Sequence, residues 1–143
     1  MRTLNIVVLG ILFGATLAAG DSPPASSPPA KANVKTLLQT PLAEEFTPDR
    51  EILVDLVEIP PGTSMDRHWH PGEEFHYYLE GDVEIKLEGA PSIIGKPGTV
   101  GHVPFKRWHT AVAGEKGAKI LVFRVHTKGK PWRYLEEEQP PKR

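Results

Sequence analysis

The sequence predicts an all-β domain of the antiparallel sandwich, barrel or jelly-roll class. Short apolar or alternating runs recur from residue 34 onward, and turn residues bound each of them. No segment shows a long 3.6-residue hydrophobic period with helix caps. The 143 residues include 13 Gly and 15 Pro, which suits many short strands joined by turns. We expect roughly eight to ten strands in about 100 residues.

The strands are predicted from their residue patterns in chain order. Residues 52–59 form an apolar run rich in β-branched residues, which ends at two prolines and a glycine. Residues 75–79 and 83–87 are predicted as two strands, with a turn at Gly81-Asp82 between them. The later strand candidates are 92–95, 99–103, 109–113 and 118–126. Residues 132–138 are expected to form a short turn or helix.

The first twenty residues have the pattern of a secretory signal peptide. Arg2 precedes an apolar stretch over residues 6–17, and a small-x-small site follows at 18–20. A membrane anchor is the less favoured alternative, because a span needs about 20 apolar residues. We therefore expect a signal peptide over 1–20, a Pro/Ser-rich linker over 21–33, the folded domain over 34–131 and a tail over 132–143. Export predicts a periplasmic or secreted protein with no membrane contact after cleavage.

Composition excludes several classes of function. The chain has no cysteine, which excludes disulfides, thiol nucleophiles and cysteine-ligated zinc. The formal net charge is -1, so no basic surface points to nucleic acid.

Two histidines and a glutamate form the candidate metal site. His68 and His70 are two residues apart, so on a strand both imidazoles face the same side. Glu74 follows a bend at Pro71-Gly72, which allows its carboxylate to return to the same space. Two imidazoles and a carboxylate suit Fe, Mn, Ni, Co, Cu or Zn, and residue type alone does not choose among them. On spacing alone, histidines that are merely hydrogen-bonded or exposed remain the competing interpretation.

The same segment resembles the first motif of the cupin superfamily. That motif is Gly, five residues, His-x-His, three or four residues, Glu, six residues and Gly, and the stretch from Gly62 to Gly81 meets every position. Residues 98–113 are similar to the second motif, with His109 at its histidine position. Lys106 and Ala113 depart from the Gly and Asn of that motif.

The resemblance implies a jelly-roll barrel, or double-stranded β-helix, that holds one divalent transition metal. Its ligands would be His68, His70, Glu74 and His109, with open positions for water, oxygen or substrate. The family also makes a homodimer plausible.

Further residues near the motifs are candidates for chemistry. His76 and Tyr78 lie two and four residues after Glu74, so on a strand all three side chains face the same side. His76 is either a catalytic base and partner of the site or a core histidine, and Tyr78 is expected to pack in the core. Arg124 and His126 are expected on the solvent side of their strand, opposite an apolar face formed by residues 121, 123 and 125. His102 is not assigned, and residues 106–108 are expected to form a surface turn.

Two functions are compatible with these residues. The first is a metal-dependent enzyme that acts on a small molecule, either dioxygenase-like or a Lewis-acid lyase, isomerase or decarboxylase in which His76 or Glu74 moves the proton. The alternative is a cupin that binds or senses a small ligand without turnover. An accessible cavity at the metal would favour the enzyme, and a narrow, filled barrel would favour the binding protein.

Overall fold

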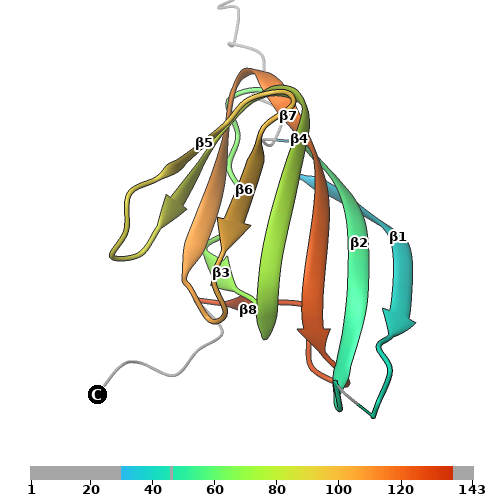
Figure 1. Ribbon diagram of the computed structural model, residues 1–143. Helices are drawn as coiled ribbons and strands as arrows, with labels where there is room; N and C mark the ends of the chain where they lie inside the picture. The colour runs from blue at the N-terminus through green and yellow to red at the C-terminus, as the bar shows by residue number, and fades with distance from the viewer. Residues whose placement is uncertain (1–29, 46, 137–143) are drawn as a thin grey trace, which may run out of the picture.

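One curled antiparallel sheet of eight strands forms the described part of the molecule (Figure 1). The structure is a computed structural model that describes residues 30–45 and 47–136. The strands are β1 Asn33–Pro41, β2 Arg50–Ile59, β3 His68–Trp69, β4 Gly72–Leu87, β5 Ile93–Gly95, β6 Val100–Val103, β7 His109–Thr127 and β8 Tyr134–Leu135. The predicted all-β, jelly-roll fold class is confirmed. The predicted signal peptide and most of the predicted linker lie outside the described residues.

The two longest strands, β4 and β7, pair with each other along most of their length (Figure 1). Each had been predicted as two shorter strands, which is wrong. Gly81, where a turn was expected, sits at a register shift with a φ of +69° and lets β4 bend without ending. A Cβ at Gly81 would lie 1.9 Å from the carbonyl oxygen of Gly117, so the two backbones need this glycine to approach each other.

The C-terminal end of the described chain is a strand. Residues 134–135 form β8, which pairs with β3, so the expected turn or helix at this point is wrong. The rings of Trp69 and Tyr134 stack at 4.2 Å and fix this pairing. Across the part of the chain that the structure describes, no helix has the length and hydropathy of a membrane span.

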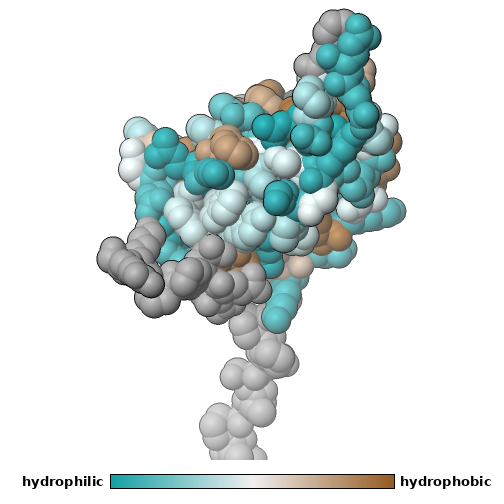
Figure 2. Space-filling model, turned by 90° about the horizontal axis from the view of Figure 1, so that it is seen from below, coloured by the Kyte–Doolittle hydropathy of each residue, from teal (hydrophilic) through white to brown (hydrophobic). Residues whose placement is uncertain are grey.

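The inner surface of the sheet is apolar in one region and polar in another. The apolar core consists of Val57, Ile59, Tyr78, Val83, Ile85, Val103, Ala111, Ala113, Ala118, Ile120 and Val122. The buried polar side chains are Glu51, Asp55, His68, His70, Glu74, His76, His109, Arg124 and His126. Seen from below, hydrophilic residues cover most of the surface of the described chain (Figure 2).

Arg124 and His126 lie on the inner face of β7, so their predicted outward position is wrong. They are 2% and 1% exposed, whereas Phe123 on the other face is 40% exposed. Both faces of this strand carry apolar residues, so alternation could not decide which one faces inward. The inward arginine is tolerated because it pairs with two carboxylates.

Candidate metal centre

Three imidazoles converge from separate parts of the chain. His68 lies on β3, His70 lies just before β4, and His109 begins β7 directly opposite His68. One nitrogen from each ring lies within 4.8 Å of the others, and each residue is 2% exposed. The Nε2 atoms of His68 and His70 are 3.1 Å apart. The structure therefore brings together the three histidines that the motifs selected, while their role as metal ligands stays a prediction.

Backbone carbonyl groups orient all three rings. Each Nδ1 faces a carbonyl oxygen, at 2.6 Å for His68 and Asp66, 2.6 Å for His70 and Trp132, and 2.9 Å for His109 and Arg107. A carbonyl oxygen only accepts hydrogen bonds, so each Nδ1 carries the hydrogen. In a neutral ring, the Nε2 atom then presents a lone pair to the common centre. Second partners of this kind commonly fix the tautomer of metal-binding histidines.

Burial keeps His68 and His70 in the form that binds metals. It lowers the pKa of His68 to about 2, and the neighbouring His109 and His70 lower it further. Burial also lowers the pKa of His70, against the opposing effect of Glu74. Both rings are therefore neutral near pH 7, which is the state a metal ion requires.

Glu74 completes the polar centre from β4. Its Oε2 atom is 2.9 Å from Nε2 of His70, and its Oε1 atom is 3.5 Å from Nε2 of His109. The Nε atom of Arg124 donates to Oε2 at 2.5 Å, and another nitrogen of the same guanidinium bonds Asp55. Burial raises the pKa of the Glu74 carboxyl, but the guanidinium of Arg124 beside it lowers the pKa more, so it lies well below 4.5. Glu74 is therefore an anion held against two of the imidazoles.

His76 is tied to Glu74 and to the core. Its Nε2 atom donates to Oε1 of Glu74 at 2.6 Å, and its Nδ1 atom is 3.0 Å from the hydroxyl of Tyr78. Tyr78 is 1% exposed, and burial, together with Glu74, raises its pKa to about 12. Both ring nitrogens of His76 thus have partners in the protein, an arrangement that orients Glu74. Its role as a catalytic base stays a prediction.

Other sequence candidates lie away from the cluster. His102 is on the opposite face of the sheet, where its Nε2 atom is 2.7 Å from the carboxylate of the partly exposed Glu73. Lys106 lies in an exposed turn with a φ of +58°, as expected for a surface loop.

Sequence reasoning missed the pairing of Arg124 with Asp55. Asp55 interrupts the apolar run 52–59 near its middle, and Arg124 does the same late in the run 118–126, whereas Glu58 and Lys119 lie near the ends of these runs. Opposite charges inside two apolar strands were the signal that could have found this pair.

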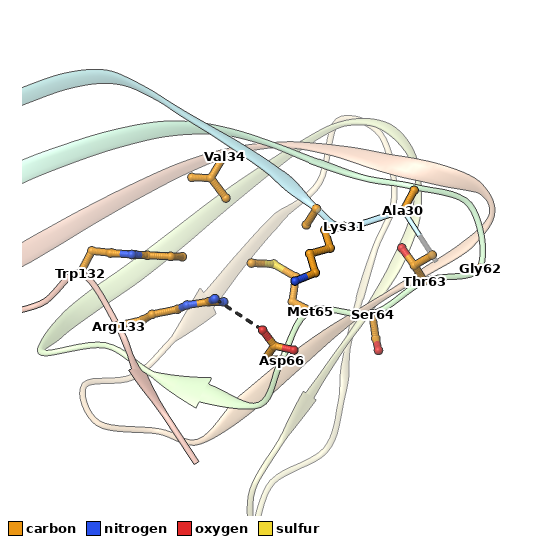
Figure 3. Close-up of a pocket in the computed structure, with 11 residues that line it drawn as sticks. Ala30, Lys31, Val34, Gly62, Thr63, Ser64, Met65, Asp66, Trp132 and Arg133 are labelled. Atoms are coloured by element: carbon orange, nitrogen blue, oxygen red, sulfur yellow. Dashed lines mark ion pairs between the residues drawn. The ribbon is translucent and has the colours of Figure 1, made fainter. Parts of the chain in front are cut away.

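The space inside the cluster is small, and a larger pocket lies outside it. A cavity of about 20 Å³ is lined by His68, Glu74, His76, His109 and Arg124 together with apolar side chains. A pocket of about 610 Å³ lies beside it, lined by Lys31, Asp66, Trp132, Arg133 and neighbours (Figure 3). The side chain of Met65 lines both spaces, so it separates the pocket from the cluster.

Comparison with known proteins relates the domain to the cupins. Residues 55–124 match the family model of a cupin domain. This segment is therefore similar to a cupin domain in sequence, and the all-β fold agrees with that similarity. The matched segment contains β3 to β6, the three histidines and Glu74, and it ends at Arg124. A search of curated proteins found no match.

Several solved structures share the fold of this chain. The DMSP lyase DddQ from Ruegeria pomeroyi DSS-3 matches with a TM-score of 0.63 and 20% identity, over 78% of this chain and 54% of DddQ. A cupin-like protein from Thermotoga maritima matches with a TM-score of 0.56 and 22% identity, over 75% of this chain and 80% of that one. KdgF from Halomonas sp. matches with a TM-score of 0.52 and 23% identity, over 71% and 86%. The chain spans about half the length of DddQ, and at these identities the likeness concerns the fold.

Proposed function

We propose that this cupin binds one divalent transition-metal ion through His68, His70, Glu74 and His109 and acts as a metal-dependent enzyme on a small molecule. The observation that carries the proposal is the convergence of three Nε2 lone pairs, each directed by a hydrogen bond from Nδ1 to a carbonyl group. Buried lone pairs that face each other repel unless a cation lies between them. Neutral imidazoles and a carboxylate suit Fe, Mn, Ni, Co, Cu or Zn.

The residues around the cluster support this role. When bound, the ion would supply Lewis-acid or redox chemistry. Glu74 is held in place by Arg124 and His76, so its carboxylate can stay directed at the centre while a ligand exchanges. Glu74 or His76 would move a proton in a lyase, isomerase or decarboxylase reaction, whereas a dioxygenase reaction would consume O₂.

One observation favours the alternative of ligand binding without turnover. The cavity beside the histidines measures about 20 Å³, which admits about one water molecule. A larger substrate would have to displace Met65, the residue between this cavity and the outer pocket. A protein that holds a metal and a very small ligand needs no such movement.

Metal analysis of the untagged protein tests the proposal. We expect about one metal ion per chain and a rise in melting temperature when the matching ion is added back to chelated protein. His109→Ala should abolish both, whereas His102→Ala, which changes an exposed histidine on the other face of the sheet, should preserve both. Absence of bound metal in the parent protein, with no thermal shift from any of the six ions, would refute the metal site.

Turnover is tested separately on the metal-loaded protein. Conversion of a candidate phenol or enol with O₂ uptake identifies a dioxygenase, and conversion without uptake identifies Lewis-acid chemistry. Tight metal binding with no conversion across the screen supports the binding protein.

We also propose export and self-association. Export rests on the signal-like pattern of residues 1–20, and N-terminal sequencing of protein from the periplasm or medium tests it. Self-association rests on the outer face of the sheet formed by β4, β6 and β7, which exposes Phe75, Tyr77, Leu79, Val100 and Phe123. An apolar face of this extent is suited to a second copy of the chain.

A further inference from the structure

A second pocket, separate from the histidine cluster, has the chemistry of a ligand site. It measures about 380 Å³ and is lined from β1, β2, β7 and the segment that follows β7. Its polar walls include Gln39, Glu51, Asp55 and His126. Trp132 and Val34 border it as well as the larger pocket drawn in Figure 3. None of the three histidines of the candidate metal centre lines it.

Glu51 is a buried carboxylate without a cation. The residue is 9% exposed, and the one hydrogen bond of its side chain among the described residues comes from the neutral amide of Gln39, at 2.9 Å. No lysine, arginine or histidine of residues 30–45 and 47–136 forms an ion pair with it. A carboxylate with so little exposed surface normally has an ionic partner. Asp55 differs, because it pairs with Arg124.

His126 presents an unused acceptor beside Glu51. The two residues are direct cross-strand partners on β2 and β7, so their Cβ atoms lie about 5 Å apart on the same face. Nε2 of His126 donates to the carbonyl oxygen of Lys130 at 3.1 Å. In the neutral ring, Nδ1 is then a bare lone pair, and it is the one buried side-chain polar atom of the described residues without a partner. The side chains of Glu51 and His126 are therefore neighbours with no hydrogen bond between them.

We propose that this pocket binds a small organic cation that carries N–H donors, such as a primary ammonium group. The ammonium would lie between the carboxylate of Glu51 and Nδ1 of His126, donating one hydrogen bond to each. A cation supplies the counter-charge that Glu51 lacks, and its N–H groups satisfy the acceptor that His126 leaves open. Lys130, an exposed residue, is the one lysine or arginine in the lining of this pocket and would compete with the ligand. The proposal does not depend on the metal site.

Direct binding of small probes to the full chain tests this assignment. Propylammonium should bind with a dissociation constant in the range of about 1–10 mM and should shift the ¹⁵Nδ1 resonance of His126. Tetramethylammonium has the charge but no N–H donor, and propanol has a donor but no charge. Both should bind at least about tenfold more weakly than propylammonium.

Variants test whether probe binding depends on this pocket or only on the overall charge of the protein. Glu51→Gln keeps the shape and removes the charge, and we expect propylammonium binding to weaken by about tenfold or more. Glu84→Gln, the same change on an exposed carboxylate of β4, should leave binding unchanged. Lys130→Met removes the competing cation and should tighten binding a fewfold. His126→Phe removes the acceptor, and its folding is checked by its amide spectrum.

Several outcomes would overturn the proposal. No saturable binding of propylammonium up to about 50 mM would remove the site. Equal binding of tetramethylammonium would reduce recognition to charge alone, and equal binding of propanol would make the ligand a neutral alcohol. Unchanged binding in correctly folded Glu51→Gln would place the probe elsewhere on the molecule.

Discussion

Replacement of Arg124 by methionine should destabilise this protein strongly. Arg124 is 2% exposed and donates from Nε to Glu74 and from Nη1 to Asp55. Methionine fills similar space but leaves two buried carboxylates without their cation. Breaking a buried ion pair by removing one partner costs about 3–5 kcal/mol. For a domain of about 100 residues this corresponds to a fall in melting temperature of about 15–30 °C.

The assay is urea unfolding of chelated protein, followed by circular dichroism. Arg67→Met is the matched control, because the Arg67 side chain is 33% exposed and pairs with the exposed Glu136. Exposed ion pairs contribute about 0–1 kcal/mol, so this variant should stay within about 1 kcal/mol of the parent protein. Arg124→Lys should fall between the two, because one ammonium cannot reproduce the two directed bonds of a guanidinium.

Bound metal should reduce the stability loss caused by Arg124→Met. An ion bound beside Glu74 supplies part of the missing positive charge, so the loss in Arg124→Met should be smaller in metal-loaded protein than in chelated protein. A loss below about 1 kcal/mol in chelated Arg124→Met, no larger than in Arg67→Met, would refute the view that Arg124 neutralises these two carboxylates.

Three further predictions follow from the packing, the titration and the outer surface. Gly95→Ala should lower the free energy of unfolding by about 1–3 kcal/mol, because its Cβ would lie 2.3 Å from the ring of Tyr78. Gly114→Ala is the control, because the atom nearest to its Cβ would be 3.4 Å away. Equal urea midpoints for the two variants would contradict the clash. The free energy of unfolding should fall as pH drops below about 6.5, by about 1.4 kcal/mol per pH unit for His68 alone, because the unfolded ring binds a proton that the folded ring, with a pKa of about 2, does not. Urea unfolding at stepwise lower pH measures this slope. A flat profile between pH 6.5 and the acid transition would refute the prediction. Tyr77 is 45% exposed on the outer face, and Tyr77→Glu should convert a dimer to a monomer in sedimentation. Glu84→Gln should leave the dimer intact. A parent protein that sediments as a monomer would exclude the proposed self-association.

The fold class and the location of the histidine cluster could be predicted from the sequence because both depend on local spacing. His68 and His70 share a face through the two-residue period of a strand. The resemblance to cupins added His109 by its motif position, and the structure places it directly opposite His68. The bend at Gly81 was mistaken for a turn because a glycine beside an aspartate predicts a turn equally well.

The orientation of β7 could not be predicted, because the information lies in distant residues. Both faces of its second half are apolar, so burial of Arg124 depends on Glu74 and Asp55, which are 50 and 69 residues away in sequence. The general tendency of charged side chains to face solvent gave the wrong face. The inward direction of His126 follows from the same register, because it lies two residues further along the strand.

Hydrogen bonds to the backbone, not to other side chains, orient the three imidazoles of the cluster. Each imidazole is oriented through Nδ1 by a backbone carbonyl group, and these carbonyl groups belong to Asp66, Arg107 and Trp132. A backbone carbonyl cannot be removed by side-chain substitution, so a change at Asp66 or Arg107 should leave the direction of the Nε2 lone pairs intact. Trp132 differs, because its position depends on the chain segment between β7 and β8 staying in place. Loss of the β3–β8 pairing would therefore release His70 while His68 and His109 kept their partners, which makes this terminal segment the part of the centre most sensitive to truncation.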